Sequence, residues 1–113
     1  TQRVENLSLA DAKVWQSTVV SVAYDSDVEL VQRLLAQAAL AQTRVLRDPG
    51  PSAALSAFGA DGLEFTLGYW IADPENGQLN LRSLINLAIL AALRAHNIEI
   101  PFPQRVIHQV RSD

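Results

Sequence analysis

Residues 97–106 read Asn-Ile-Glu-Ile-Pro-Phe-Pro-Gln-Arg-Val, and this stretch decides where the fold ends. Its first part has the composition of a short buried strand, and two prolines separated by a phenylalanine follow it. Proline has no backbone N–H and a fixed φ angle, so neither Pro101 nor Pro103 can lie in a central strand of a sheet. The pattern predicts that the chain leaves the domain here in an extended conformation and continues as a second extended run.

The segments upstream of this exit alternate between strand and helix patterns. β-branched residues dominate 14–24, where both faces are partly apolar, as is typical of an interior strand. The run from Ser26 to Glu29 has the form of a capping box, which predicts the start of a helix. In order, the expected elements are a strand at 14–24, a helix at 28–43, strands at 54–58 and 63–71 joined by a turn at 59–62, a helix at 79–96 and a short strand at 98–100.

This order of elements predicts an α+β fold, a ferredoxin-like split βαββαβ sandwich with a C-terminal extended strand. Each helix carries an apolar stripe, so we expect both helices to cover the same face of the sheet. In the second helix the expected core stripe consists of Leu81, Leu84, Ile85, Ala88 and Ala92.

Several leucines fall outside the expected core stripes of the two helices. Leu90 and Leu93 lie near the far side of the second helix, and Leu30 and Leu40 lie off the stripe of the first. Apolar side chains that cluster in solvent mark interaction surfaces. We therefore expect Leu90 and Leu93, or Leu30 and Leu40, to be more exposed in an isolated subunit than in an assembly. The alternative is that the terminal segments of the same chain cover them.

The composition bounds the class of protein. The chain has 113 residues, enough for one domain with its own core, and a hydrophobic content of 49% excludes a disordered chain. A net charge of -3 argues against nucleic-acid binding, and zero cysteines exclude disulfides and thiolate sites. The longest apolar window, 84–95, is shorter than the roughly 20 residues of a membrane-spanning helix. Because the chain lacks a starting methionine and a signal peptide, we expect it to be a piece of a longer protein.

The residues that could carry chemistry do not form a catalytic or metal-binding pattern. Asp25, Asp27 and Glu29 could bind a divalent cation, but acidic residues are also favoured at the start of a helix, and we prefer that interpretation. Neither His96 nor His108 has further ligands at metal spacing. There is no nucleophile elbow and no phosphate-binding loop. The sequence predicts no enzyme activity, no cofactor and no bound metal.

Other functions of the same fold are possible from these patterns. An RNA-binding module would need aromatic residues such as Phe65, Tyr69 and Trp70 on an open sheet face, and acidic residues flank them here. A free-standing regulatory domain that binds a small ligand is the main alternative, because fold alone says little about function. The segment 101–103 could also be a proline-rich ligand, although its position favours a structural exit.

Two segments together carry a resemblance to a known family: 97–106, and Val22 to Asp27, which reads Val-Ala-Tyr-Asp-Ser-Asp. With these two segments the chain resembles the cytoplasmic C-terminal domain of the small-conductance mechanosensitive channel (MscS) family. The resemblance runs from Val4 to Arg111. It implies that residues 1–12 end a middle β domain, that 13–102 form the α/β cytoplasmic domain, and that 103–113 form a C-terminal strand for an oligomer barrel.

The resemblance also implies a function and a location. Members of the family form homo-oligomers, typically heptamers, in the bacterial inner membrane. On the cytoplasmic face their soluble parts build a cage that solutes cross when membrane tension opens the pore during osmotic shock. We expect this chain to contribute to oligomer assembly and solute filtering, and to reach the membrane only through upstream transmembrane helices that it lacks.

The terminal run supplies most of the residues expected at the contacts between subunits. An isolated extended strand has unpaired N–H and C=O groups along both edges, and closing several copies into a barrel removes these edges. The expected oligomer interface consists of Pro101, Phe102, Pro103, Gln104, Val106, His108 and Val110, together with Leu90 and Leu93.

Overall fold

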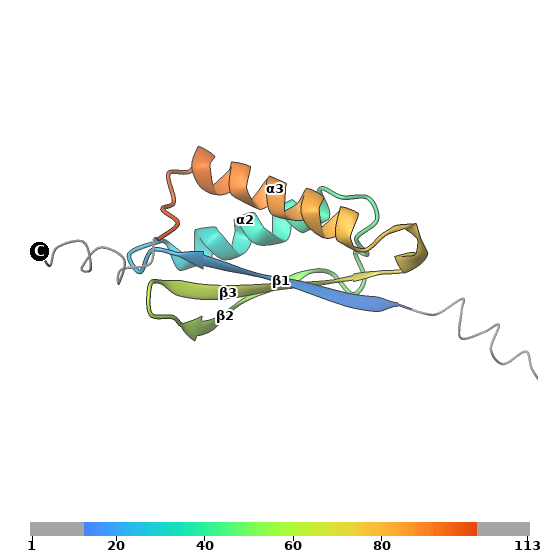
Figure 1. Ribbon diagram of the computed structural model, residues 1–113, viewed down its shortest axis with the longest axis horizontal. Helices are drawn as coiled ribbons and strands as arrows, with labels where there is room; N and C mark the ends of the chain where they lie inside the picture. Colours follow the sequence, from blue (N-terminus) through green and yellow to red (C-terminus); the bar gives the residue numbers. More distant parts are fainter. Residues whose placement is uncertain (1–12, 102–113) are drawn as a thin grey trace, which may run out of the picture.

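The computed structural model describes residues 13–101, which form a three-stranded antiparallel sheet covered on one face by two helices (Figure 1). Both helices lie on the same side of the sheet, so that expectation is confirmed, as is the α+β fold class. The elements are β1 (Val14–Val22), α2 (Val28–Leu40), β2 (Ser52–Phe58), β3 (Leu63–Ile71), the 3-10 turn η1 (Pro74–Asn76) and α3 (Leu79–Ala95).

The central strand of the sheet is β3, since the strand order is β1-β3-β2. Apolar residues occupy every second position of β3, which matches the period of a strand, and these side chains from Leu63 to Ile71 are buried against the helices. The expectation that β1 is an interior strand is wrong for the described residues. There β1 pairs only with β3, along a continuous register from Val14 opposite Ile71 to Val22 opposite Leu63.

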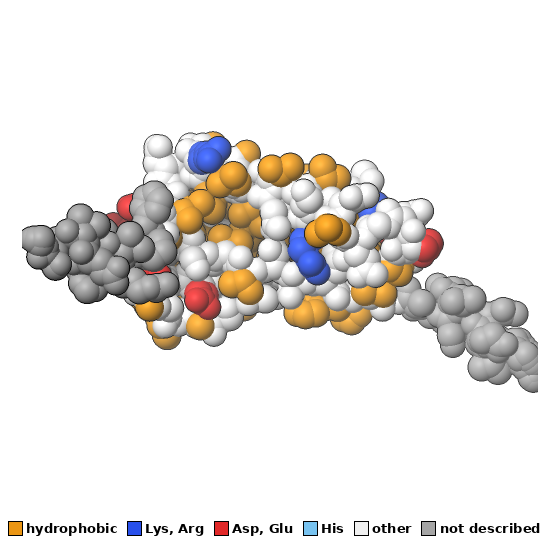
Figure 2. Space-filling model, viewed as in Figure 1, with side chains coloured by type: hydrophobic (Ala, Val, Ile, Leu, Met, Phe, Trp, Pro, Cys, Tyr) orange, Lys and Arg blue, Asp and Glu red, His pale blue; other side chains and the backbone are white. Residues whose placement is uncertain are grey.

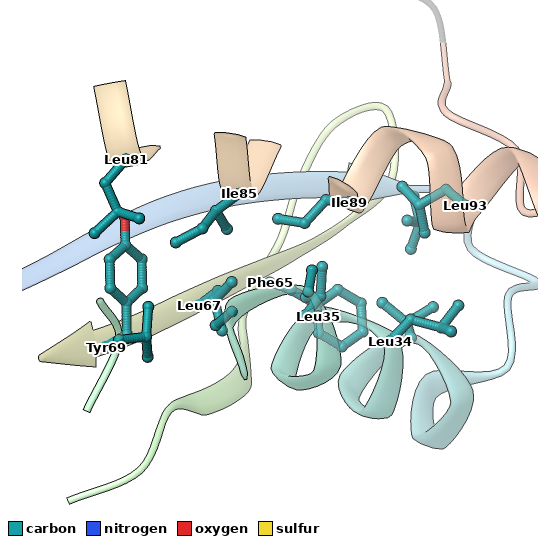
Figure 3. Close-up of a cluster of buried hydrophobic side chains, with 14 of the residues drawn as sticks. Leu34, Leu35, Phe65, Leu67, Tyr69, Leu81, Ile85, Ile89 and Leu93 are labelled. Atoms are coloured by element: carbon teal, nitrogen blue, oxygen red, sulfur yellow. The ribbon is translucent and has the colours of Figure 1, made fainter. Parts of the chain in front are cut away.

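The core lies between the sheet and the two helices. Figure 3 shows the side chains of Leu81, Ile85, Ile89 and Leu93 pointing from α3 toward those of α2 and β3. The core that these elements form is apolar, and its buried members include Val31, Leu34, Leu35, Phe65, Leu67, Tyr69, Leu81, Ile85, Ile89 and Leu93. Burying each large side chain contributes about 1.5–3 kcal/mol, so this layer holds the helices on the sheet.

The start of α2 differs from the capping box that the sequence suggested. Asp27, not Ser26, is the N-cap residue, and its carboxylate accepts a hydrogen bond from the backbone N–H of Leu30 at 3.2 Å. An aspartate at this position satisfies one of the unpaired N–H groups and interacts favourably with the helix dipole. The helix ends at Leu40, three residues before the expected end at 43.

The buried stripe of α3 also differs from the expected one. Leu81 and Ile85 are buried as expected, but Leu84 is 51% exposed, and the stripe continues with Ile89 and Leu93. The second helix carries apolar residues around most of its circumference, so periodicity alone could not set its rotation. The packing against β1, β3 and α2 sets it instead.

The last expected strand, 98–100, is not a strand within the described part of the chain. One backbone hydrogen bond joins this segment to the sheet, from the N–H of Ala23 to the carbonyl of Glu99 at 2.9 Å. A single bond just beyond the end of β1 does not form a ladder. The described residues therefore form a βαββα fold, followed by an extended segment that contacts the end of the sheet.

Candidate functional site

The exit of the chain is set by the way α3 ends. Asn97 adopts a left-handed conformation with φ of 57°, and its N–H bonds the carbonyl of Arg94 at 3.2 Å. The N–H of Ile98 bonds the carbonyl of Leu93 at 2.9 Å, which completes a Schellman motif. Ile98 then packs against the core. This cap turns the chain back toward the end of the sheet and gives the segment 98–101 its direction.

The exit segment crosses the end of the sheet at Gly62. A Cβ added to Gly62 would lie 2.9 Å from Cγ of Pro101 and 2.3 Å from the carbonyl oxygen of Val22. Only glycine leaves room for both neighbours, so the proline ring can rest on the residue just before β3. The described chain therefore leaves the domain at the end of the sheet where β1 finishes and β3 begins.

Most of the predicted interface residues lie outside the described residues. They are Phe102, Pro103, Gln104, Val106, His108 and Val110. Pro101 is half-buried at the position given above. The assignment of all seven of these residues to a subunit interface stays a prediction.

The leucines expected on the outer sides of the helices have different environments. Leu93 is only 1% exposed and belongs to the core, so the expectation that it lies on the far side of α3 is wrong. Its side chain is almost completely covered within the domain. Leu90 is partly exposed. Leu30 and Leu40 are partly buried, and Leu30 packs against the core.

Leu90 lines a groove between α3 and the outer edge of β1. The groove has a volume of about 260 Å³. Figure 2 shows hydrophobic side chains gathered between α3 and β1 in the same view. We call this feature the β1–α3 groove, and its lining residues are Thr18, Val19, Val20, Ser21, Asn86, Ile89, Leu90, Leu93 and Ile100.

The sequence patterns did not predict this groove. Within the groove, Thr18 and Asn86 are joined by a side-chain hydrogen bond of 2.8 Å. The remaining lining is mostly aliphatic, and none of the lining residues carries a charge. The signal that could have found it is the strand 14–22, Val-Trp-Gln-Ser-Thr-Val-Val-Ser-Val, which contains no charged residue.

In the described part of the chain, Asp25, Asp27, His96 and Glu99 line one pocket between the start of α2 and the end of α3, but they do not form a metal-binding cluster. Among residues 13–101, no group of three or more histidine, cysteine or acidic side chains is placed to hold a metal ion. Asp27 caps α2, which confirms capping as its role. His96 is the exposed C-cap residue of α3.

Two of the three aromatic residues that an RNA-binding module would need lie under the helices and not on the open sheet face. Phe65 and Tyr69 are both fully buried beneath the helices (Figure 3). Burial raises the pKa of the Tyr69 hydroxyl above its ordinary value, while the nearby Arg82 guanidinium acts in the opposite direction. Trp70 pairs with Trp15 on the face that the helices leave open, and Trp15 lies over Gly68. Of the three aromatic residues that the RNA-binding alternative requires, only Trp70 lies on the open face.

One ion pair holds the end of the sheet opposite the exit. Nε of Arg44 lies 2.9 Å from Oδ2 of Asp73, and the same guanidinium donates a second bond to the backbone carbonyl of Asp73 at 2.9 Å. This contact links the α2–β2 connection to the turn before α3. The hydrogen bond from Arg44 lowers the pKa of Asp73, and a bond from Asn76 acts in the same direction.

Neither helix within residues 13–101 has both the length and the apolar character that crossing a membrane requires.

Comparison with known proteins gives a consistent result. The C-terminal domain of the mechanosensitive ion channel MscS matches residues 17–100. A small-conductance mechanosensitive channel of Edwardsiella ictaluri is 36% identical over 90 residues, which are 80% of this chain and 31% of that protein. The mechanosensitive channel MscK of Escherichia coli is 32% identical over 108 residues, which are 96% of this chain and 10% of that protein.

A solved structure has the same fold. The crystal structure of Helicobacter pylori MscS in its closed state is similar with a TM-score of 0.75 and 31% sequence identity. The similarity covers 82% of this chain and 36% of that one. The chain thus spans about a third or less of the relatives that it matches. This chain belongs to the MscS family of mechanosensitive channels, and the part that matches is the family's C-terminal domain.

Proposed function

We propose that this chain is the cytoplasmic cage domain of a mechanosensitive channel, where it contributes to assembly of a homo-oligomer and to filtering of solutes released during osmotic shock. The observation that carries the proposal is the match of residues 17–100 to the C-terminal domain of MscS, together with the similarity to the solved channel. The role is structural and needs no catalytic residue. A free-standing ligand-binding domain is not favoured, because the relatives are channels.

The described surface supports an assembling domain. Several large apolar side chains are exposed on both layers, among them Trp15, Val19, Leu84 and Leu87, each at 51–60%. Exposed apolar residues gathered on a small domain are typical of surfaces that bind other proteins. Copies of the domain placed side by side around a pore axis would cover such residues.

The arrangement along the chain completes the proposal. Residues 1–12 end the middle β domain, 13–102 form the α/β domain, and 103–113 form the strand that joins its copies in a barrel. The described chain points out of the domain at Pro101, and proline cannot extend the sheet by donating a ladder hydrogen bond. The subunit number proposed is seven, and the location is the cytoplasmic face of the bacterial inner membrane.

The test uses the intact gene product that carries this chain. It is expressed in bacteria that lack their own mechanosensitive channels, and survival is measured after a sudden drop in external osmolarity. We expect the intact protein to restore survival and a protein lacking residues 104–113 to restore less of it. Removal of Ser112 and Asp113 alone is the control, and membrane levels are matched by immunoblot. Absence of rescue by the intact protein at normal membrane levels would refute the channel role.

A further inference from the structure

A group of polar side chains lies inside the domain, beneath the first turn of α3. It consists of Gln16 of β1, Tyr69 of β3, Gln78 and Arg82. Gln16 and Tyr69 are direct partners in the antiparallel register, so their side chains share the face that the helices cover. Gln16 is 3% exposed and Tyr69 is 0% exposed. Figure 3 shows Tyr69 pointing from β3 toward the start of α3, where Leu81 lies.

One carbonyl oxygen holds Gln16 next to Arg82. The carbonyl of Gln78 accepts a hydrogen bond from Nε2 of Gln16 at 3.3 Å and another from the backbone N–H of Arg82 at 3.1 Å. The Arg82 guanidinium also lies near the Tyr69 hydroxyl, where it opposes the rise in the pKa of that hydroxyl that burial causes. The four residues therefore form one compact group, which we call the polar cluster.

Three buried atoms of the polar cluster have no hydrogen-bond partner within residues 13–101. They are Oε1 of Gln16, the hydroxyl of Tyr69 and Nε of Arg82. The protein encloses all three atoms, so bulk solvent does not reach them. Buried polar groups are nearly always hydrogen-bonded, because an unpaired group loses its contacts with water and gains none in return. The polar cluster therefore needs a further partner.

The chemistry of the three atoms selects the kind of partner. Oε1 of Gln16 can only accept a hydrogen bond, Nε–H of Arg82 can only donate one, and the Tyr69 hydroxyl can do both. The amide oxygen would repel an anion, and the guanidinium would repel a metal cation. A neutral molecule that donates and accepts satisfies all three atoms, and it must be small because they are enclosed. Water has these properties and typically makes about three hydrogen bonds when buried.

We propose that one water molecule is bound in the polar cluster, where it accepts from Nε of Arg82, donates to Oε1 of Gln16 and bonds the hydroxyl of Tyr69. This water joins β1 and β3 to the first turn of α3. The turn has few other polar anchors, because the side chain of Gln78 makes no capping hydrogen bond and the first turn contains no acidic residue. The inference goes beyond the proposed function and does not depend on it, since all the partners belong to one subunit.

The test combines a crystal structure of the 113-residue chain, at a resolution that shows ordered water, with magnetic relaxation dispersion of the solvent, which counts long-lived internal waters. We expect a water about 2.7–3.2 Å from each of the three atoms. The double variant Gln16→Leu/Tyr69→Phe should lose it, so that the count falls by one. Tyr24→Phe is the control and should leave the count unchanged, because that hydroxyl is outside the polar cluster and bonds the carbonyl of Gly59 directly.

Several results would overturn the inference. One is a crystal structure in which the hydroxyl of Tyr69 bonds Arg82 or Gln16 directly and no water lies between them. Another is a different occupant, either a side chain from residues 1–12 or 102–113 or an anion recognised by its anomalous scattering. An unchanged count of internal waters in the folded double variant would also contradict it. If the double variant fails to fold, as judged by circular dichroism, the structure of the unsubstituted chain decides alone.

Discussion

At the scale of single residues, Arg44 and Asp73 connect segments that are far apart in the sequence. The guanidinium bonds both the carboxylate and the backbone carbonyl of Asp73, and the two side chains are 24% and 30% exposed. Partly exposed ion pairs are worth about 0.2–1 kcal/mol, so this contact positions the turn before α3 more than it stabilises the domain.

This ion pair gives a pH-dependent prediction. The pKa of Asp73 is lowered by folding, so its contribution to stability is complete above the ordinary value of 3.8 and is lost as the pH falls through the lower folded value. Asp73→Asn should therefore be less stable than the unsubstituted protein at pH 7, with the difference shrinking below about pH 4. Urea unfolding at a series of pH values measures this. Glu75→Gln removes a charge from the same turn as a control, and a difference that did not change with pH would contradict the prediction.

At the scale of the elements, Ser26 and Asp27 are neighbouring residues that could each cap the start of α2, and the structure assigns the cap to Asp27. Asp27 accepts the hydrogen bond from Leu30, and Ser26 precedes the cap. Asp27→Ala should lower the free energy of unfolding by about 1 kcal/mol, and Ser26→Ala should change it by less than about 0.5 kcal/mol. Thermal or urea unfolding of the two variants compares them directly. A larger loss of unfolding free energy for Ser26→Ala than for Asp27→Ala would mean that Ser26 caps the helix, as the sequence suggested.

The rotation of α3 gives a second comparison between elements. Leu93 is 1% exposed and Leu84 is 51% exposed, although both are leucines of the same helix. Leu93→Ala should cost about 2–5 kcal/mol because it opens a cavity in the core. Leu84→Ala should cost less than about 0.5 kcal/mol in the monomer, as is usual for surface positions. The free energy of unfolding in urea is the measurement, and equal costs would mean that α3 is rotated differently.

The elements that the sequence predicted well are those with one clear apolar stripe. The alternation in β3 and the stripe of α2 each have a single possible inward face, and both were assigned to the elements observed. In α3 apolar residues occupy most sides, so only packing could show that Leu93 faces inward and Leu84 outward. A strand was wrongly predicted at 98–100 because an apolar, extended sequence pattern does not show whether a neighbouring strand is there to pair with it.

At the scale of the whole molecule, the position of the exit was predictable and the candidate surface was not. Two prolines indicated that the chain leaves the sheet, and Pro101 does rest at its end. The β1–α3 groove depends on which strand lies at the edge, and this follows from the strand order rather than from any one segment. Six of the proposed interface residues lie outside the described part of the chain, so the interface stays a prediction.

The subunit number of the intact gene product tests the central claim most directly. Native mass spectrometry of the purified protein should show one defined homo-oligomer, with seven subunits as the proposed number. A protein lacking residues 104–113 should dissociate at lower activation energy or lose that number, while hydrogen exchange shows that the core of α2, α3 and β3 is unchanged. A monomeric intact protein would contradict the assembly role, and an unaltered subunit number and stability after truncation would contradict the role of the terminal run.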